Sequence, residues 1–289
     1  MQVPDLLLPE LLAPLLQETI FAGKLHHAMS VGSTNNIALE AGASGYPEGS
    51  VFVAEEQTAG RGRGGHIWHS AASQGIYCSV LLRPQLPPDQ VLLLSLAVGL
   101  AVRSAVQEIT GLQADLKWPN DLLLSEKKFC GILTELQWDA EHVRHVVVGI
   151  GLNVNHASFP DILLAEATSL YLETGIDHSR VQMTAALLKS LDREYRVLAS
   201  AQDARESILR RFQEHSSWTR GCAIQVEESN SFTGVTEGLN GRGFLQVRTL
   251  QGLQTIVSGT VRRQTELLNM AKTKSAVARR KNDNHVARP

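Results

Sequence analysis

The chain has 289 residues, of which 43% are hydrophobic and 19% are charged, and its formal net charge at pH 7 is -2. This length and composition suit one large and one small globular domain, with a core that needs no disulfide bonds to fold. The nearly neutral charge balance excludes a general attraction to nucleic acid or to an anionic membrane, so any chemistry on anions must be local.

The cysteines and histidines lack the spacing of a metal site or a redox motif. The three cysteines lie far apart: Cys78, Cys130 and Cys222. An odd number of isolated cysteines favours a reducing compartment, so we expect a cytoplasmic protein. The ten histidines follow no ligand pattern either, and the sequence therefore predicts no metal site built from side chains.

Neither a leader peptide nor a membrane span is predicted. The leucine-rich amino terminus contains acidic residues and is interrupted by Pro4, Pro9 and Pro14, and no basic stretch precedes it. The longest apolar run, residues 91–102, is shorter than the roughly 20 residues that cross a bilayer. We therefore expect a soluble protein without membrane contact.

In chain order, the first predicted strands are residues 51–54 and 75–82, which are short, apolar and rich in β-branched or aromatic side chains. About 20 residues lie between them, and loops of that length in a compact domain usually carry function. A helix is predicted from residues 87–89, where proline suits the first turn, to about Ile109, just before Gly111.

The next hundred residues contain three extended segments followed by two helical patterns. Three extended segments are joined by polar turns: 114–124, 129–138 and 143–155, with turns at 125–128 and 139–142. Short turns between successive strands imply antiparallel pairing. Two helical patterns follow, at 179–199 and 202–216. We therefore predict an α+β fold, a mixed β-sheet with helices packed on one face.

The carboxy-terminal part has a different texture. Short strands alternate with glycine turns: 223–228, 232–235, 243–247 and 253–258. A stretch of this kind predicts a small β-barrel. The last residues, 271–289, are basic and nearly free of large apolar side chains, so they are predicted to be a disordered, solvated tail. The predicted domains are residues 1–218, 219–268 and the tail 269–289.

The run Gly60-Arg61-Gly62-Arg63-Gly64-Gly65 lies in the long loop, shortly before Trp68. Its glycines let backbone amides come close to a ligand, and its arginines provide fixed positive charge and bidentate donors. No Gly-Lys-Ser/Thr follows, and the arginines interrupt the dinucleotide-binding spacing. The run predicts an anion-binding loop, and the alternative is a flexible basic connector.

Three further segments place polar residues beside strand residues that are expected to be buried: Lys117-Trp118-Pro119-Asn120-Asp121, Lys128-Phe129-Cys130-Gly131-Ile132-Leu133-Thr134-Glu135 and Gly149-Ile150-Gly151-Leu152-Asn153-Val154-Asn155. Polar groups next to a core need a reason. Pro119 breaks its strand, so Asn120 and Asp121 either point into a cleft or form an Asx turn.

Together these motifs resemble the biotin protein ligases. The resemblance rests on five sets in matching order and spacing: Ser33-Thr34-Asn35, Gln57-Thr58-Ala59-Gly60-Arg61-Gly62-Arg63, Lys117–Asp121, Lys128 with Gly131-Ile132-Leu133, and Gly149–Asn155. It covers residues 28–268. It implies a seven-stranded mixed sheet related to class II aminoacyl-tRNA synthetases, followed by an SH3-like barrel.

The resemblance also implies a two-step reaction. The biotin carboxylate attacks the α-phosphate of ATP, with magnesium present, to give biotinyl-5′-AMP and pyrophosphate. A lysine of a biotin carboxyl carrier protein, from acetyl-CoA carboxylase or a related carboxylase, then attacks the acyl-adenylate. Closure of the glycine loop over the adenylate would keep water from the mixed anhydride.

The site residues are implied by the same resemblance. The biotin-binding set is Ser33, Thr34, Asn35, Gln57, Gly60, Arg61, Arg63, Lys128, Gly131 and Ile132. The ATP-binding set is Arg63, Trp68, Asn120, Asp121, Lys128 and Asn153. Arg63 and Lys128 form the catalytic pair, in which Arg63 grips the carboxylate and phosphate and Lys128 counters the charge of the transition state. Trp68 is expected to stack on adenine.

Two departures from the family pattern affect the interpretation. His66 stands where many bacterial members have another arginine, which leaves open how many cations bind the phosphates. The residues before Met29 are too few for the winged helix-turn-helix domain of the bifunctional members, so we expect no repressor role and no specific DNA binding. An exposed sheet edge would allow a homodimer.

Three alternatives stay open at this point. A lipoate–protein ligase would share the fold and the chemistry, although the glycine–arginine loop and the barrel favour biotin. A nucleic-acid-binding module could use the arginines and the basic tail, but the acidic balance and the absence of a binding motif argue against it. A catalytically silent scaffold would be expected to have lost Arg63 or Lys128, and both are present.

Overall fold

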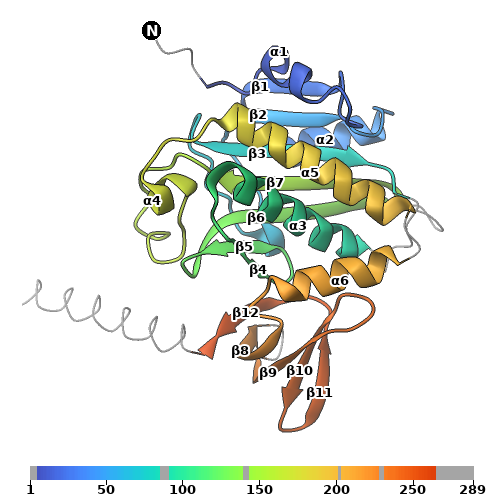
Figure 1. The fold of residues 1–289 in the computed structure, drawn as a ribbon, viewed down its shortest axis with the longest axis vertical. Helices are drawn as coiled ribbons and strands as arrows, with labels where there is room; N and C mark the ends of the chain where they lie inside the picture. Colours follow the sequence, from blue (N-terminus) through green and yellow to red (C-terminus); the bar gives the residue numbers. More distant parts are fainter. Residues whose placement is uncertain (1–4, 85–90, 139–142, 201–202, 228–230, 265–289) are drawn as a thin grey trace, which may run out of the picture. The chain divides into compact units, whose positions relative to one another are not determined.

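The computed structural model describes residues 5–84, 91–138, 143–200, 203–227 and 231–264 (Figure 1). The chain divides into two compact units, Met1–Ser216 with Gly241–Gly243, and Ser217–Asn240 with Phe244–Pro289. Three predictions lie outside the described residues: the helix start at 87–89, the turn at 139–142 and the tail 269–289.

The first unit is built on a seven-stranded sheet in the order β1-β2-β3-β7-β6-β5-β4. Its strands are β1 Leu25–Val31, β2 Val51–Gln57, β3 Gly75–Leu82, β4 Asp115–Lys117, β5 Asp121–Leu124, β6 Lys127–Trp138 and β7 Val143–Asn153. The β1–β2 pair is parallel, and every other neighbouring pair is antiparallel. The sheet is therefore mixed, as predicted.

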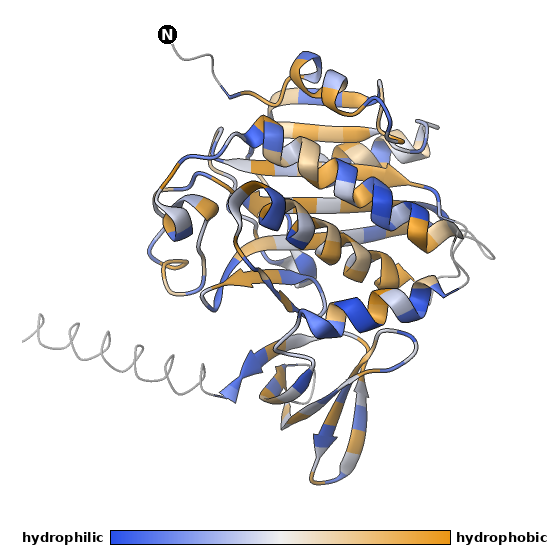
Figure 2. Ribbon diagram, viewed as in Figure 1, coloured by the Kyte–Doolittle hydropathy of each residue, from blue (hydrophilic) through white to orange (hydrophobic). Residues whose placement is uncertain are grey.

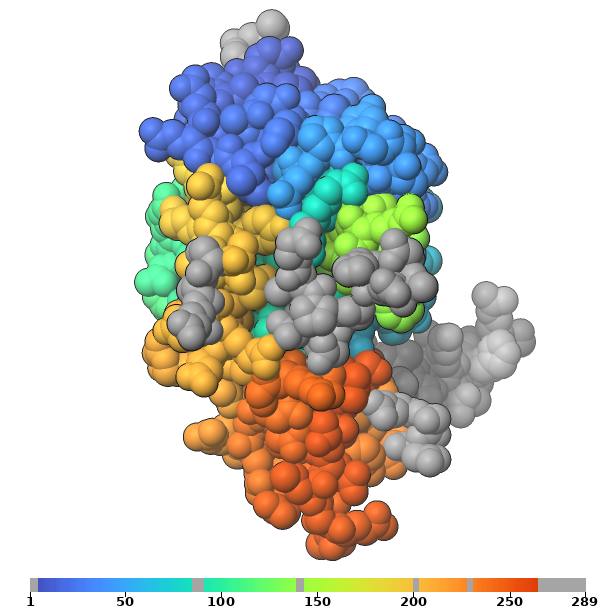
Figure 3. Space-filling model, turned by 90° about the vertical axis from the view of Figure 1, so that its right-hand side faces the viewer, coloured from blue at the N-terminus to red at the C-terminus, as the bar shows by residue number. Residues whose placement is uncertain are grey.

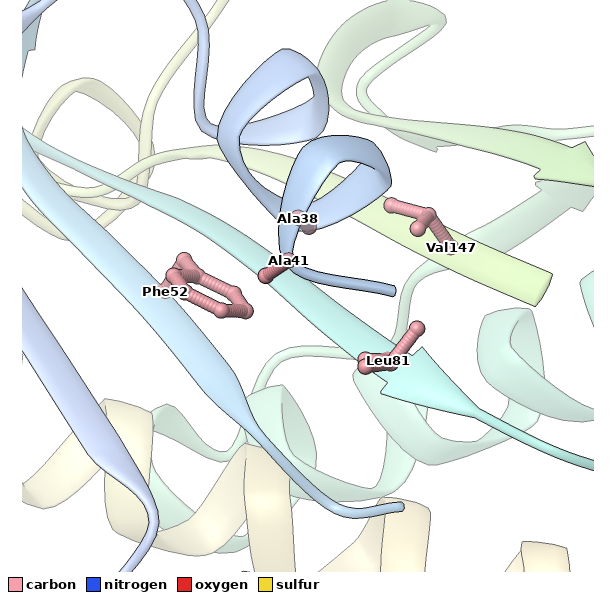
Figure 4. Close-up of a cluster of buried hydrophobic side chains, with 5 residues drawn as sticks. All are labelled: Ala38, Ala41, Phe52, Leu81 and Val147. Atoms are coloured by element: carbon pink, nitrogen blue, oxygen red, sulfur yellow. The ribbon is translucent and has the colours of Figure 1, made fainter. Parts of the chain in front are cut away.

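Helices cover both faces of this sheet, so the expectation of helices on one face is wrong. Three long helices lie on one face: α3 Val91–Thr110, α5 Arg180–Ser200 and α6 Ala204–Glu214 (Figure 1). Helix α2, Thr34–Ala43, packs against β2, β3 and β7 on the opposite face (Figure 4). Short helical turns complete the unit: α1 Pro9–Leu12, η1 Ala13–Leu15, η2 Arg63–Gly65 and α4 Leu170–Thr174.

The core lies between the central strands and the long helices. All eight residues of β3 are buried, and β7 is buried over most of its length. Figure 2 shows apolar residues concentrated on these strands and on α3. Among the described residues, α3 alone has the length and apolarity of a membrane span, and 61% of its most apolar window is buried inside the protein. Most of the apolar surface of α3 therefore packs in the core.

Three elements differ from the sequence expectations. The extended segment 114–124, predicted as one strand interrupted at Pro119, is two strands that pair with each other, because Trp118-Pro119-Asn120 forms a turn between β4 and β5. Strand β1 was not predicted, because it lies at the sheet edge and its half-exposed residues do not alternate regularly. Helix α2 was missed because its small and amide side chains form only a weak apolar face.

The amino-terminal residues pack beside α5. Ile20 donates its backbone N–H to Asp192 Oδ1 on α5 at 3.0 Å. Leu7, Leu12 and Leu16 are fully buried. In Figure 3 this segment, in dark blue, lies directly against the gold residues of α5. The leucine-rich start of the chain is therefore part of the core of the first unit.

The second unit is a five-stranded antiparallel sheet in the order β11-β10-β9-β8-β12. Its strands are β8 Arg220–Glu227, β9 Phe232–Leu239, β10 Leu245–Thr249, β11 Gly252–Ile256 and β12 Thr260–Arg263. Ile224, Val226 and Val247 are fully buried at its centre. This architecture agrees with the small β-barrel predicted from the glycine-punctuated strands, with β12 as an additional strand.

Helix α2 is held on the sheet by a compact apolar cluster. Ala38 and Ala41 of α2 meet Phe52 of β2, Leu81 of β3 and Val147 of β7, and all five are buried (Figure 4). Phe52 fills the space beside two alanines that have no bulk of their own. The position of α2 therefore depends on side chains of the strands.

We expect Phe52→Ala to lower the free energy of unfolding by about 3–5 kcal/mol, because it leaves a cavity that the two alanines cannot fill. Urea unfolding followed by circular dichroism measures the change. Met29→Ala on the exposed side of β1 is the control and should stay within about 0.5 kcal/mol of the original protein. Equal losses in both variants would contradict the packing role of Phe52.

Candidate active site

A cleft of about 430 Å³, open solvent included, lies between the first turn of α2, the glycine–arginine loop and strands β3, β6 and β7. It is lined by eleven of the residues predicted for the site: Ser33, Thr34, Asn35, Gln57, Arg61, Arg63, Trp68, Asn120, Lys128, Gly131 and Ile132. Residues from five separate stretches of the chain thus meet at one place.

Three predicted residues do not line the cleft. Gly60 is buried where an added Cβ would stand 2.5 Å from the carbonyl oxygen of Trp68. Asp121 lies behind Lys128 as its ion-pair partner. Asn153 is buried and donates its side-chain amide to the carbonyl oxygen of Thr168 at 3.0 Å. These three support the site from outside its surface.

Six lining residues had no predicted role: Gly62, Cys78, Leu133, Gly149, Ile150 and Gly151. Gly149 and Gly151 belong to a motif that the sequence analysis singled out, and two glycines in a buried strand could have signalled a close approach. Cys78 carried no such signal. Burial raises the pKa of its thiol to about 12, so it lines the cleft as a neutral group.

The base of the cleft is a polar network around the start of α2. Thr34 donates its backbone N–H and its hydroxyl to Gln57 Oε1, at 2.9 and 3.1 Å. Gln57 in turn donates its amide to Ser70 Oγ at 3.0 Å. Asn35 accepts a hydrogen bond from Ser79 Oγ at 2.6 Å. These partners fix the orientations of the polar side chains before any ligand binds.

Strand glycines form the floor of the cleft. An added Cβ at Gly151 would stand 2.4 Å from Trp68 Cε2, and one at Gly131 would stand 2.9 Å from Trp68 Cζ3. The indole of Trp68 therefore lies against the backbone of β6 and β7. Its Nε1 is buried and has no hydrogen-bond partner among the described residues. An added Cβ at Gly149 would stand 2.0 Å from Asn35 Oδ1.

Two cations of the cleft, Lys128 and Arg61, are held by protein carboxylates. Lys128 Nζ lies 2.6 Å from Asp121 Oδ1 and 5.4 Å from the ring centre of Trp68. Arg61 makes two contacts with Glu135, the shorter at 2.7 Å. Arg63 lies at the start of η2 and also faces the cleft. An anionic ligand would therefore meet positive groups that are already oriented.

The far end of the loop is anchored by a buried ion pair. Glu55 Oε2 accepts hydrogen bonds from Arg180 Nη1 at 2.8 Å and from Ser73 Oγ at 3.3 Å. Ser73 has a left-handed backbone, with φ of 56°, and its N–H donates to the carbonyl oxygen of Glu55. Burial alone would raise the pKa of Glu55, but the Leu7 N–H and Arg180 outweigh it and lower that pKa. The carboxylate stays charged.

A buried histidine lies below the same loop. His156 is fully buried and stacks on Phe159, with ring centres 5.2 Å apart. Its Nε2 lies 3.3 Å from the hydroxyl of Tyr77, which donates to the carbonyl oxygen of Ala71. The Tyr77 hydroxyl therefore accepts the His156 Nε2–H. Burial, followed by the charges of His69 and Arg180, lowers the pKa of His156 to about 4.

No three histidine, cysteine, aspartate or glutamate side chains come together as metal ligands in the described part of the chain. The carboxylate of Asp121, beside Lys128, is a suitable oxygen ligand for a divalent ion that enters with a bound molecule.

Comparison with known proteins points to one family. The profile of the Biotin/lipoate A/B protein ligase family matches residues 28–153. The chain is 35% identical over 236 residues to the bifunctional ligase/repressor BirA of Bacillus spizizenii. That alignment covers 80% of this chain and 71% of that protein. It is 41% identical over 169 residues to the biotin–acetyl-CoA-carboxylase ligase of Mycobacterium tuberculosis, and this alignment covers 56% of this chain and 60% of that protein.

A solved structure extends the likeness to three dimensions. The biotin protein ligase from Aquifex aeolicus in complex with biotin and ATP aligns with a TM-score of 0.74 at 32% identity. The alignment covers 84% of this chain and 100% of that one. The similarity therefore extends well beyond the residues that line the cleft.

We expect His156 to make the protein less stable as the pH falls from 6.5 to 4. The unfolded imidazole, with its ordinary pKa of 6.5, takes up a proton in this range, whereas the folded one, with a pKa of about 4, does not. Between pH 6.5 and pH 4, the free energy of unfolding of His156→Gln should fall by about 3 kcal/mol less than that of the original protein. Urea unfolding at several pH values measures both slopes, with exposed His66→Gln as control. Parallel slopes for His156→Gln and the original protein would refute the assignment.

We expect Gly149→Ala to lower the free energy of unfolding by about 1–3 kcal/mol, because the new Cβ overlaps Asn35. The same substitution made in an Asn35→Ala background should cost much less, since the overlapping atom is gone. Gly99→Ala in α3, where the nearest atom is 3.6 Å from an added Cβ, is the matched control. A cost that persists in the Asn35→Ala background would contradict the overlap.

Proposed function

The chain belongs to the biotin protein ligase family, and on that premise we propose that it is an ATP-dependent biotin ligase. In the first step biotin becomes biotinyl-5′-AMP, and in the second the biotinyl group passes to a lysine of a carrier protein. The main support is the cleft that gathers eleven of the predicted site residues around a polar base, a glycine floor and three lysine or arginine side chains.

We propose that the bicyclic ring of biotin occupies the base of the cleft. Its ureido group needs both donors and acceptors, and the buried Ser33 and Thr34 and the partly buried Gln57 lie there. A site of this kind rejects ligands that leave such groups unpaired, at about 1–3 kcal/mol for each group. Trp68 lies on the glycine floor nearby, where we place a contact with biotin, and the adenine stacking expected from sequence stays a prediction.

The phosphate end is assigned to Lys128, Arg63 and Asn120. A carboxylate oxygen of biotin attacks the α-phosphorus, a new C–O–P linkage forms, and the bond to the β-phosphate breaks to release pyrophosphate. Lys128 and Arg63 oppose the negative charge that concentrates on the α-phosphate. Magnesium is proposed to enter with ATP, held mainly by phosphate oxygens and near the Asp121 carboxylate.

The second step needs an adenylate that is shielded from water. Glycines at 62, 64 and 65 allow the tip of the loop to close, and Arg63 gives the tip a positive charge that closes onto the anionic adenylate. The amine of the acceptor lysine then attacks the acyl carbon, an amide forms and AMP leaves. We propose a biotin carboxyl carrier domain of acetyl-CoA carboxylase or a related carboxylase as the acceptor, and the cytoplasm as the location.

The decisive assay supplies the purified protein with ATP, magnesium, a carrier domain and equal amounts of biotin and lipoate. Intact mass spectrometry of the carrier reports the product. We expect the mass increase of one biotinyl group, which is lost without ATP. A lipoyl increase would transfer the assignment to lipoate ligation, and no increase with several carrier domains would overturn ligation altogether.

We expect Lys128→Ala to slow biotin-dependent pyrophosphate release by roughly 10²- to 10³-fold, since it removes a cation aimed at developing charge. Lys127→Ala is the matched control, because its neighbouring side chain is exposed and only its tip approaches the Leu164 carbonyl. Pyrophosphate release is measured by a coupled enzyme assay. Normal release from Lys128→Ala would remove Lys128 from the mechanism.

A further inference from the structure

The glycine–arginine loop is a small hairpin closed by backbone hydrogen bonds, with the turn η2 at its tip. Trp68 donates its N–H to the Gly60 carbonyl at 2.9 Å, and Gly62 donates to the His66 carbonyl at 2.7 Å. Arg61 and Ile67 form an antiparallel bridge between them. Arg61 therefore stands at the base of the hairpin, whereas η2 forms its tip.

One carboxylate holds this base to the sheet. Glu135, in the second half of β6, accepts hydrogen bonds from Arg61 Nη2 at 2.7 Å and from Arg61 Nη1 at 3.1 Å. Arg61 Nη1 also donates to Asn36 Oδ1 on α2 at 2.7 Å. The guanidinium is thus occupied on two sides, by a strand and by a helix.

The same carboxylate reaches the base of the cleft. Glu135 Oε2, which accepts from Arg61, also accepts from Asn35 Nδ2 at 2.9 Å. Asn35 is buried, and its Oδ1 takes the hydrogen bond of Ser79. Glu135 therefore links the loop above the cleft to the amide at its base, although it does not line the cleft.

We propose that Glu135 is a positioning residue that pins the base of the glycine–arginine hairpin and orients Asn35 for biotin. The inference rests on the proposed function for its ligand, whereas the pinning itself is a property of the free protein. In this arrangement Arg61 acts through structure, and the cations that answer an incoming anion are Arg63 and Lys128. Loop movement is confined to the tip.

The chemistry of Glu135 makes a sharp variant available. Both of its oxygens accept, and all the groups that face them are donors. Glutamine has the same shape but carries one amide nitrogen, so Glu135→Gln sets a donor against a donor and removes the charge. Glu135→Asp keeps the charge on a shorter stem. Glu194→Gln is the matched control, since Glu194 holds Arg211 by two contacts at 2.6 and 2.8 Å between α5 and α6.

The first readout is limited trypsin digestion of the free protein, with mass spectrometry of fragments that begin at Gly62 and Gly64. Trypsin must take the arginine side chain, so an Arg61 held by Glu135 resists cleavage. We expect Glu135→Gln to raise the rate of cleavage after Arg61 about tenfold, in proportion to the population of released loop. Glu135→Asp should be intermediate, and Glu194→Gln unchanged. Should Glu135→Gln fail to fold, Glu135→Asp is judged by the same readouts.

The second readout separates positioning from general damage. We expect Glu135→Gln to raise the KM for biotin about tenfold with kcat for adenylate formation within about twofold, because binding is weakened and the phosphate end is intact. Unchanged cleavage together with an unchanged KM would overturn the proposal, as would an equal effect in Glu194→Gln. If even the original protein ignores biotin while Glu135→Gln is cut faster, the proposed function fails and the pinning stands.

Discussion

The candidate site depends on the absence of side chains at three positions in two neighbouring strands. Gly131 of β6 and Gly149 and Gly151 of β7 let an indole and a buried amide lie directly on the sheet backbone. A methyl group at Gly151 or Gly149 would stand within 2.4 Å or 2.0 Å of Trp68 or Asn35, a distance that packed atoms do not tolerate. The cleft exists because the sheet, usually the most filled part of a core, is left thin there.

Much of this arrangement was predictable from sequence, and the reasons are local. The strands β3 and β7 are largely apolar, and a run of this kind predicts burial from the local sequence alone, without knowledge of what packs against it. The cleft residues belong to short motifs whose spacing is specific, so the resemblance predicted eleven of them in one place. The strand break at Pro119 was visible because proline cannot donate to a sheet ladder.

The remaining features depend on contacts between distant residues and leave no local signal. Helix α2 is amphipathic only in relation to Phe52, Leu81 and Val147, which lie in three different strands. The interaction of Glu55 with Arg180 joins residues 125 positions apart, and each residue alone has the sequence character of a surface charge. The placement of α2 on the second face of the sheet was missed for the same reason, because the face that a helix covers is decided only when the sheet has assembled.

The structure anchors both ends of the glycine–arginine loop and places a short glycine-containing turn between them. One end of the loop is held by Glu135 through Arg61, and the other by Glu55 through Ser73. Between these anchors, the tip at η2 contains glycines with positive φ at positions 64 and 65 and carries Arg63. A loop free at both ends would lose more conformational entropy on each closure, since every ordered residue costs about 1–2 kcal/mol. Because both ends of the loop are fixed, the proposed closure needs to order only the short turn between them, and its entropic cost stays small.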